Sequence, residues 1–256
     1  MSTETDFKTD LSGQVALVTG TTSGLGKRFA RVLAANGAKV AITGRRAGLL
    51  QELKAELENE GASVAAVALD VTDEQSIIDC VKEVEAQLGP IGILVNNAGI
   101  STEGFAVDVS IEDFDRTMNT NVRGVFLMAR EVARGMIKRG EGGQIVNIAS
   151  IAATEPLPAL TAYCTSKAAV AMMTKQLARE WARYNVNVNA ICPGFIVTEI
   201  NEHFLDTPAA QKHLAQYPKR RVGEEKDLDG ALLLLASPKS RFITGTLLVV
   251  DDGQSL

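Results

Sequence analysis

The stretch Val15–Gly26, VALVTGTTSGLG, decides the fold of this chain. A short apolar run that can form a buried strand leads directly into a loop rich in glycine, and a helical pattern follows. Such a loop can place main-chain N–H groups and the positive end of a helix dipole against a phosphate. The spacing is Gly-x-x-x-Gly-x-Gly rather than the commoner Gly-x-Gly-x-x-Gly. Its position between a strand and a helix predicts a nucleotide site.

Each glycine of this loop has an expected task. Gly20 allows a tight turn, Gly24 lets the main chain approach a pyrophosphate, and Gly26 lets helix and sheet pack closely. The loop residues that we expect to contact a nucleotide are Gly20, Thr22, Ser23, Gly24, Leu25 and Gly26.

Apolar runs and helical patterns alternate along the rest of the chain. The predicted strands are Val15–Val18, Val40–Thr43, Val64–Leu69, Ile91–Val95, Gln144–Ile148, Val186–Ile191 and Thr246–Val250. The predicted helices are Leu25–Asn36, Ala47–Glu60, Asp73–Leu88, Ile111–Arg139, Ala162–Tyr184 and Glu225–Ala236, with stops at Gly37, Gly61 and Gly89. This order predicts a doubly wound, Rossmann-type α/β fold with a seven-stranded parallel sheet and helices on both faces. We expect a flexible segment at residues 1–11, one domain at 12–256, and a less regular loop at about 195–222.

Composition excludes several classes of function. The chain has 256 residues, 46% of them hydrophobic, and a net charge of −5 without a basic run, which argues against nucleic acid as a partner. Three cysteines in no C-x-x-C pair and two histidines argue against a metal site and suit a reducing cytoplasm. The N-terminus is polar and acidic, and the longest aliphatic run is too short to span a bilayer, so we expect no membrane association.

A second motif suggests chemistry on an oxygen atom. Tyr163 and Lys167 are spaced i and i+4, so on a helix they share one face, with their Cβ atoms about 5–6 Å apart. A neighbouring ammonium group favours the phenolate, so we expect it to lower the pKa of Tyr163. Together with Ser150, thirteen residues before the tyrosine, and a nucleotide loop, this pair suggests redox chemistry on a carbonyl or alcohol.

Over nearly its whole length, from about Leu11 to Gly253, the chain resembles a classical short-chain dehydrogenase/reductase. The resemblance is carried by the loop Thr19–Gly26, Asp70-Val71, Asn96-Asn97-Ala98-Gly99, Asn121, Ser150, Tyr163 with Lys167, Pro193-Gly194 with Thr198, and Thr244-Gly245 with Asp251-Asp252-Gly253. It implies an NAD(P)-dependent oxidoreductase that interconverts a ketone or aldehyde and an alcohol.

The resemblance also assigns roles at the reacting centre. It makes Tyr163 the general acid and base, and Ser150 a hydrogen-bonding group that holds the substrate oxygen. It implies that Lys167 binds the nicotinamide ribose and lowers the pKa of the tyrosine. Asn121 would interrupt its helix and hold a water that connects Lys167 to solvent. Asn119 and Asn147 fall at no such position in the family.

Further positions are implied for the cofactor and the substrate. Asp70 and Val71 would meet the adenine, and Ile196 with Thr198 the carboxamide. The remaining cofactor positions are Asn97, Ala98, Gly99, Pro193 and Gly194. We expect a mostly apolar substrate pocket at Ile151, Leu157 and Phe195, with Phe204 and Leu205 nearby, beside Ser150 and Tyr163.

The cofactor preference depends on the end of the second strand. NAD-dependent sites place an acidic residue there for the adenosine ribose, whereas this chain has Gly44 followed by Arg45. A guanidinium group can bind a 2′-phosphate through paired N–H groups. We therefore favour NADP(H) over NAD(H), although Ser23 adds no charge in a loop where many NADP-dependent members have a basic residue.

Ala149 and Asp252 are the other departures from the family pattern, which more often has a serine and a glycine there. Two alternatives remain open. A methyltransferase that binds S-adenosylmethionine also begins with a strand, a glycine loop and a helix, but it would not explain Tyr163, Lys167 and Ser150. A nucleotide-sensing regulator on the same fold usually lacks the catalytic groups.

The resemblance also implies an assembly. In the family, two long helices of each subunit pair with those of another subunit, and here these are the helices near Ile111–Arg139 and Ala162–Tyr184. We therefore expect a homotetramer, with a dimer second.

Overall fold

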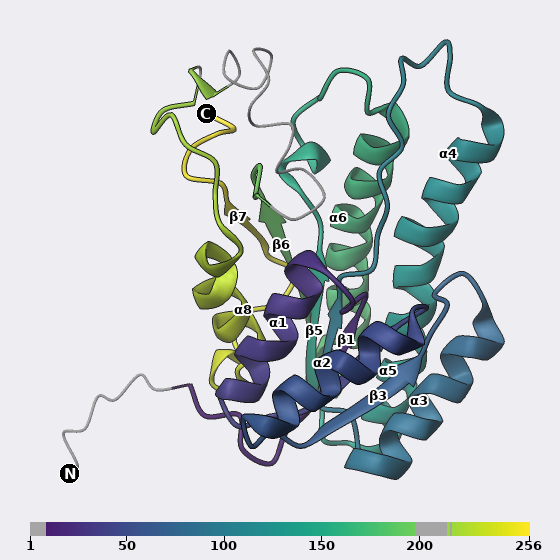
Figure 1. The fold of residues 1–256 in the computed structure, drawn as a ribbon, viewed down its shortest axis with the longest axis vertical. Helices are drawn as coiled ribbons and strands as arrows, with labels where there is room; N and C mark the ends of the chain where they lie inside the picture. The colour runs from purple at the N-terminus through teal and green to yellow at the C-terminus, as the bar shows by residue number, and fades with distance from the viewer. Residues whose placement is uncertain (1–8, 198–213, 216) are drawn as a thin grey trace.

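Seven parallel strands form one sheet at the centre of the molecule (Figure 1). The structure is a computed structural model, and it describes residues 9–197, 214–215 and 217–256. The strands lie in the order β3-β2-β1-β4-β5-β6-β7. Their bounds are β1 (Val15–Thr19), β2 (Lys39–Gly44), β3 (Val64–Ala68), β4 (Ile93–Asn96), β5 (Gly143–Ile148), β6 (Val186–Pro193) and β7 (Leu247–Val250).

The strand order reverses between β1 and β4, which pair in parallel with Ala16 opposite Ile93. From β1 the chain builds outward through β2 to β3, then returns to β4 and builds toward β7. In a doubly wound sheet, ligands bind outside the carboxyl ends of the strands at this reversal. The loops after β1 and β4 therefore mark the expected place of the site.

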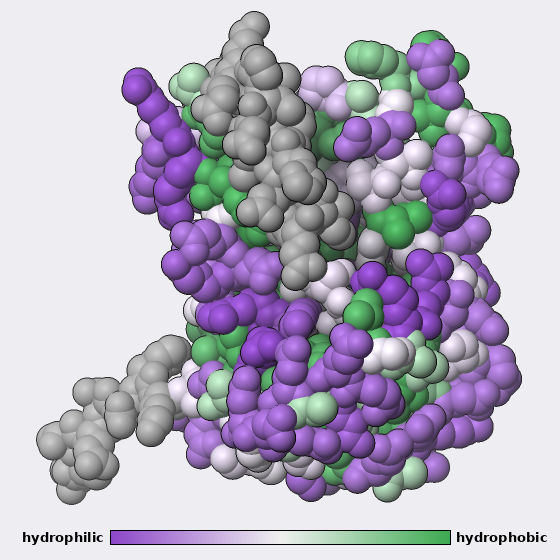
Figure 2. Space-filling view, in the orientation of Figure 1, coloured by the Kyte–Doolittle hydropathy of each residue, from purple (hydrophilic) through white to green (hydrophobic). Residues whose placement is uncertain are grey.

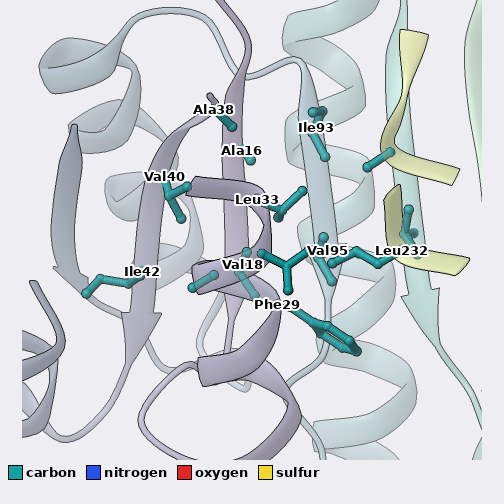
Figure 3. Packing of buried hydrophobic residues seen from close by; sticks show 14 of the residues in the cluster. Ala16, Val18, Phe29, Leu33, Ala38, Val40, Ile42, Ile93, Val95 and Leu232 are labelled. Atoms are coloured by element: carbon teal, nitrogen blue, oxygen red, sulfur yellow. The ribbon is translucent and has the colours of Figure 1, made fainter. Parts of the chain in front are cut away.

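Helices cover both faces of the sheet. Their bounds are α1 (Gly24–Ala35), α2 (Ala47–Asn59), α3 (Glu74–Leu88), α4 (Ile111–Met118), α5 (Val125–Arg139), α6 (Thr161–Trp181) and α8 (Asp229–Ala236). Helices α1, α2 and α8 share one core with the sheet, and α3, α5 and α6 share the other. Figure 3 shows Phe29 and Leu33 reaching from α1 toward Val18 and Val95, with Leu232 of α8 beside them. Full burial of side chains such as these stabilises the fold by about 1.5–3 kcal/mol each.

The predicted strands and helices are all present in the predicted order, so the Rossmann-type fold is confirmed. The glycines expected to stop helices do so: Gly37, Gly61 and Gly89 follow α1, α2 and α3 closely and have φ angles of 92°, 88° and 101°. Only glycine adopts such angles freely, which explains these stops.

One predicted helix is divided. Residues Ile111–Arg139 form α4, then a π-helical turn η1 (Asn119–Gly124), then α5. Within η1, a Cβ on Gly124 would lie 2.9 Å from the Val71 carbonyl oxygen, so the turn packs directly against the loop after β3. The interruption surrounds Asn121, where the family resemblance implied one.

The expected flexible segment extends one residue too far. Leu11 is fully buried in the core with α1, and its N–H donates to the Asn36 carbonyl at 2.8 Å. Because an apolar side chain is favoured in the core, the folded domain includes Leu11. The expected loop at 195–222 lies only partly within the described residues.

Candidate active site

Helix α6 and the end of β5 bring Tyr163, Lys167 and Ser150 together. Tyr163 and Lys167 lie one turn apart on α6, and the Lys167 Nζ is 5.5 Å from the centre of the tyrosine ring. The ammonium donates to the Ile148 carbonyl at 2.8 Å, which ties the lysine to the last residue of β5. Ser150 follows two residues later and starts a 3₁₀ turn, η2 (Ile151–Ala153), by accepting from the Ala152 N–H at 3.1 Å.

Burial sets the pKa values at this centre. Burial raises the pKa of the Tyr163 phenol above its usual value of 10, while a hydrogen bond with Ser150 opposes the rise. Lys167 is only 6% exposed, and burial lowers its pKa to about 8. The expectation that Lys167 lowers the pKa of Tyr163 is wrong for the protein alone. The lysine ammonium is directed at Ile148, and the cost of burying a phenolate dominates.

Asn121 fastens the turn η1 to the loop after β4 and to α6. Its Oδ1 accepts from the Ile100 N–H at 2.8 Å, and its Nδ2 donates to the Ile100 carbonyl at 2.8 Å and to the Ser166 Oγ at 3.0 Å. Ser166 in turn donates to the Tyr163 carbonyl at 2.7 Å. Asn121 is 1% exposed, and its side chain ties the turn η1 to α6 through Ser166.

The glycine loop packs against the loop after β4 without room for a side chain. A Cβ on Gly26 would lie 2.1 Å from the Gly20 carbonyl oxygen and 2.5 Å from the Asn97 Nδ2. Asn97 donates through that Nδ2 to the carbonyls of Thr19 at 2.9 Å and Gly20 at 3.1 Å. Gly20 and Gly24 have φ angles of 71° and 54°, which glycine adopts freely. Asn97 therefore shapes the loop from the neighbouring strand.

The N-terminus of α1 differs from those of α3 and α4. Asp73 caps α3 by accepting from the N–H groups of Gln75 and Ser76, and Ser110 caps α4 by accepting from Asp113. Within the described part of the chain, Ser23 at the start of α1 makes no such side-chain bond. The first-turn N–H groups of α1 are thus not used by a cap, and they fit the phosphates of a dinucleotide.

Two arginines follow β2, and they face different groups. Arg46 donates to the Thr22 Oγ1 at 2.6 and 3.1 Å and to the Ser23 Oγ at 3.2 Å. Arg45 lies nearer to Asp70, whose pKa is lowered mainly by hydrogen bonds from Thr72 and also by the charge of Arg45. Arg45 was the expected cofactor contact, whereas its neighbour Arg46 is the arginine that contacts the glycine loop.

Asn147 and Asn119 are the two asparagines to which the family resemblance gave no role. Asn147 lies in the sheet, where its Oδ1 accepts from Asn96 at 2.9 Å and its Nδ2 donates to the Thr174 Oγ1 of α6 at 2.9 Å. Asn119 begins the turn η1.

Ala98 and Gly99 follow β4, and a Cβ on Gly99 would lie 3.3 Å from the Asn121 Oδ1 and 3.7 Å from the Lys167 Nζ.

The residues expected on the substrate side include those where β6 ends. Pro193 closes β6, and the Gly194 N–H donates to the Val250 carbonyl at 3.0 Å. Ile196 forms an isolated bridge to Gly223, with the Phe195 carbonyl and the Val197 N–H bonded to that glycine at 2.9 Å each. Ile151 is 8% exposed, and Leu157 and Phe195 are half-buried. Thr198, Phe204 and Leu205 lie outside the described residues.

Apolar side chains also reach the surface near this end of the molecule. Figure 2 shows hydrophilic residues over α1 and α2 and apolar residues gathered above α4. There Phe105, Val107 and Ile111 are 65%, 91% and 75% exposed. Over residues 9–197, 214–215 and 217–256, histidine, cysteine and carboxylate side chains form no group of three that could hold a metal ion. The helices in these same ranges are too short or too polar to cross a bilayer.

Comparison with known proteins places this arrangement in a family. The family model for short chain dehydrogenases matches residues 14–209. Gluconate 5-dehydrogenase from Gluconobacter oxydans (strain 621H) is 39% identical over 244 residues, covering 95% of each chain. A 3-oxoacyl-(acyl-carrier-protein) reductase from Thermotoga maritima is 37% identical, covering 95% of this chain and 98% of the reductase.

A solved structure agrees in detail. The crystal structure of a gluconate 5-dehydrogenase from Burkholderia cenocepacia J2315, in complex with NADP and tartrate, superposes with a TM-score of 0.93. That chain is 36% identical, and the match covers 97% of both chains. With its sheet order, its uncapped glycine-loop helix and its Ser150, Tyr163 and Lys167, this chain belongs to the classical short-chain dehydrogenase/reductase family of oxidoreductases.

Proposed function

We propose that this protein interconverts a ketone or aldehyde and an alcohol, with NADP(H) as the hydride carrier and Tyr163 as the general acid and base. The observation that carries the proposal is the meeting of two parts at one edge of the sheet. The group of Tyr163, Ser150 and Lys167 lies at the end of β5 and on α6. The glycine loop opens α1 at the reversal of strand order.

Tyr163 and Ser150 act on the substrate oxygen. When bound, the nicotinamide supplies a hydride to the carbonyl carbon, or accepts one from the alcohol carbon. In reduction the Tyr163 phenol donates its proton to the oxygen, and in oxidation the phenolate accepts it. Ser150, whose hydroxyl interacts with the Tyr163 side chain, holds that oxygen in place. The raised pKa of Tyr163 keeps the proton available for reduction near neutral pH.

Lys167 and Asn121 lie where they can assist the replacement of the proton that Tyr163 donates. Lys167 Nζ lies close to Gly99 and to the ring of Tyr163, where its charge can meet ribose hydroxyls. The side-chain amide of Asn121 is engaged with Ile100 and Ser166. A water relay would therefore use the main chain of the π-helical turn, a feature that is frequent at functional sites.

The cofactor preference rests on Arg45 and Arg46. Both are exposed at the end of β2, where Gly44 leaves no carboxylate to bind a ribose diol. A Cβ on Gly44 would lie 3.2 Å from the Thr22 methyl group, so a larger side chain would crowd the loop. Two cations beside this loop suit a 2′-phosphate. The related gluconate 5-dehydrogenase crystallised with NADP supports this preference over NAD(H).

The relatives point to two substrate classes. Gluconate 5-dehydrogenase suggests a polyhydroxylated acid, and the 3-oxoacyl reductase suggests an acyl chain. The described residues expected to line the pocket, Ile151, Leu157 and Phe195, are apolar and favour the second class. A nucleotide-sensing regulator is the alternative, and the presence of Asn121, Ser150, Tyr163 and Lys167 together argues against it.

The test is turnover by the purified protein. Gluconate, a polyol and a 3-oxoacyl thioester would each be offered with the matching redox form of NADP and of NAD, while absorbance at 340 nm is followed. We expect turnover with NADP(H) and preference for the apolar carbonyl substrate. Cofactor binding without turnover of any substrate in the panel would favour the regulator.

We also propose a homotetramer in the cytoplasm. Ile111 of α4 and Met172 of α6 are 75% and 65% exposed, and Phe126 of α5 is 39% exposed, so these helices keep apolar groups for another subunit. The three cysteines are free thiols, two of them buried, which suits a reducing compartment. Light scattering that gave a mass near 27.2 kDa would contradict the assembly, and imaging of a tagged chain tests the location.

A further inference from the structure

The C-terminal segment Val250–Ser255, here called the C-terminal clasp, contacts both described ends of the 195–222 segment. Gln254 accepts from the Phe195 N–H through its Oε1 at 2.6 Å. Asp252 accepts from the Arg221 Nε through its Oδ2 at 2.6 Å and forms a second ion pair with Lys219. Figure 1 shows the tail in yellow beside the green chain that follows residue 216, at the end toward which β6 points. One short segment thus holds two pieces of chain that are about twenty-five residues apart in sequence.

The clasp is itself ordered by hydrogen bonds. Asp251 accepts from the Gly253 N–H at 2.9 Å, the Ser255 N–H at 2.8 Å and the Ser255 hydroxyl at 2.5 Å. A Cβ on Gly194 would lie 2.5 Å from the Gln254 Oε1 and 2.7 Å from the Asp251 Cβ. The clasp therefore sits directly against the end of β6, with no space between them.

Asp252 has an unusual backbone for a residue with a side chain. Its φ angle is 58°, in the region that glycine adopts without strain and that other residues occupy infrequently. The side chain is 16% exposed, and both carboxylate oxygens are used by cations. Retaining a carboxylate at such a position is explained if its contacts with Lys219 and Arg221 are required.

The ion pairs continue into the part of the chain that bridges to Ile196. Arg221 also donates to the Asp227 Oδ2 at 3.2 Å, and that oxygen accepts from the Glu224 N–H at 3.0 Å. Between Arg221 and Glu224 lies Gly223, which pairs with the main chain on both sides of Ile196. The network therefore connects Asp252 to the stretch that contains Phe195, an expected substrate contact.

We propose that Asp252 and Gln254 are positioning residues for the substrate side of the site, which fix Phe195 and the chain at 217–223 relative to Tyr163. This proposal rests on the carbonyl–alcohol activity proposed above. The two residues do not touch the reacting atoms but act through Phe195 and Arg221. Loss of their contacts should weaken substrate binding and leave the chemical step unaffected, with a smaller effect on the cofactor, because Gly194 and Ile196 are also expected cofactor contacts.

The first test replaces Asp252 by asparagine, which tolerates the positive φ angle and removes only the charge. For D252N we expect KM for the carbonyl substrate to rise about fivefold, and kcat and Kd for NADPH each to stay within about twofold, because partly exposed ion pairs contribute modestly. Glu56→Gln is the matched control, since it removes a surface carboxylate that pairs with Arg31 between α1 and α2. An unchanged KM in D252N overturns the proposal.

Two further variants test the network. Arg221→Gln should give the same rise in KM, and the double variant with D252N should be no worse than the more affected single variant. Gln254→Ala removes the acceptor for the Phe195 N–H and should raise KM, whereas Gln254→Glu retains an oxygen acceptor and should restore it. Fully additive effects of D252N and Arg221→Gln would overturn the network.

A readout without catalysis separates this proposal from the proposed function. Amide hydrogen exchange in D252N should be faster at residues 194–197 and 217–223 than in the wild type or Glu56→Gln, and unchanged in β5. Unchanged exchange at those residues overturns the proposal, whether or not the enzyme turns over. Faster exchange in a protein that reduces no carbonyl in the panel would support the clasp and contradict the proposed function instead.

Discussion

The glycine loop and the chain that follows β6 occupy the same edge of the sheet, but they are held in different ways. The loop is fixed by main-chain carbonyls bonded to Asn97 and by a contact at Gly26 that leaves no room for one carbon atom. The chain at 194–197 and 217–223 is held by main-chain bonds at Gly194 and Gly223, and in addition by Gln254 and by partly exposed ion pairs at Asp252. A substitution that overpacks a tight steric contact destabilises the structure strongly, whereas loss of an exposed ion pair costs little free energy. The cofactor side should therefore tolerate little change, and the substrate side considerably more.

We expect the largest effect from a substitution at Tyr163, on which the proposed reaction between cofactor and substrate depends. Tyr163→Phe removes the proton donor, so kcat should fall by about 10²–10⁴-fold while Kd for NADPH stays within twofold, because the contacts of the loop are untouched. Steady-state kinetics and fluorescence titration of NADPH measure the two quantities. Tyr184→Phe, at a tyrosine that contacts Arg183 on the surface, is the control and should be neutral. A Tyr163→Phe enzyme with more than a tenth of wild-type kcat would exclude Tyr163 as the acid.

One added methyl group at Gly26 should disturb the tightly packed glycine loop on the cofactor side. Gly26→Ala places a Cβ 2.1 Å from the Gly20 carbonyl oxygen, so main chain must move. We expect a loss of about 1–3 kcal/mol in unfolding free energy, as is typical of overpacking, and a rise in Kd for NADPH of at least tenfold. Gly48→Ala, whose Cβ would have no neighbour within 4 Å, is the matched control. Equal thermal stability and NADPH affinity in the two variants would show that the loop is not tightly constrained.

Titration of Lys167 should affect the cofactor side in a predictable direction. Burial lowers its pKa to about 8, so the ammonium is present below that pH and is lost above it. If the charged form binds the ribose hydroxyls, Kd for NADPH should rise up to about tenfold between pH 7 and pH 9. In Lys167→Met, binding should be weaker at pH 7 and nearly independent of pH over this range. A wild-type profile as flat as that of Lys167→Met would contradict the role of the charge.

The smallest expected effect concerns the exposed arginines. Arg45→Ala and Arg46→Ala should each lower kcat/KM for NADPH about fivefold and leave the NADH value nearly unchanged, because each guanidinium is exposed and its charge is screened. Comparing the two variants shows which cation faces the 2′-phosphate. Wild-type preference for NADH, or no effect of either substitution on NADPH, would remove the argument for NADP(H).

The parts of the site that were predictable are those where geometry restricts residue type. Gly20, Gly24 and Gly26 could be assigned tasks in advance, because few other residues fit a positive φ angle or a contact of this kind. The order of strands followed from apolar runs separated by helices. Asn121 was located through the family resemblance, since a single asparagine carries no pattern of its own.

The features that were missed depend on how deeply a side chain is buried and on the direction in which the chain leaves a strand. Neither can be read from the sequence. The pKa of Tyr163 moves upward because burial outweighs the hydrogen bond with Ser150, and burial depends on residues distant in the chain. Arg46, rather than its neighbour, contacts Thr22 and Ser23 because of the direction in which the chain leaves β2. The clasp at Asp252 was visible only as a departure from the family pattern.

The buried hydrogen bonds from Asn96 through Asn147 to Thr174 fix the position of α6 along its axis relative to the sheet. Thr174 lies eleven residues after Tyr163, about three helical turns along the same face. If α6 shifted along its axis by one residue, its side chains would advance by about 1.5 Å and rotate by about 100°, and the Asn147 amide would be buried without its partner. Catalytic geometry commonly tolerates less displacement than that. An amide deep in the sheet thus fixes the position of Tyr163 along the axis of α6.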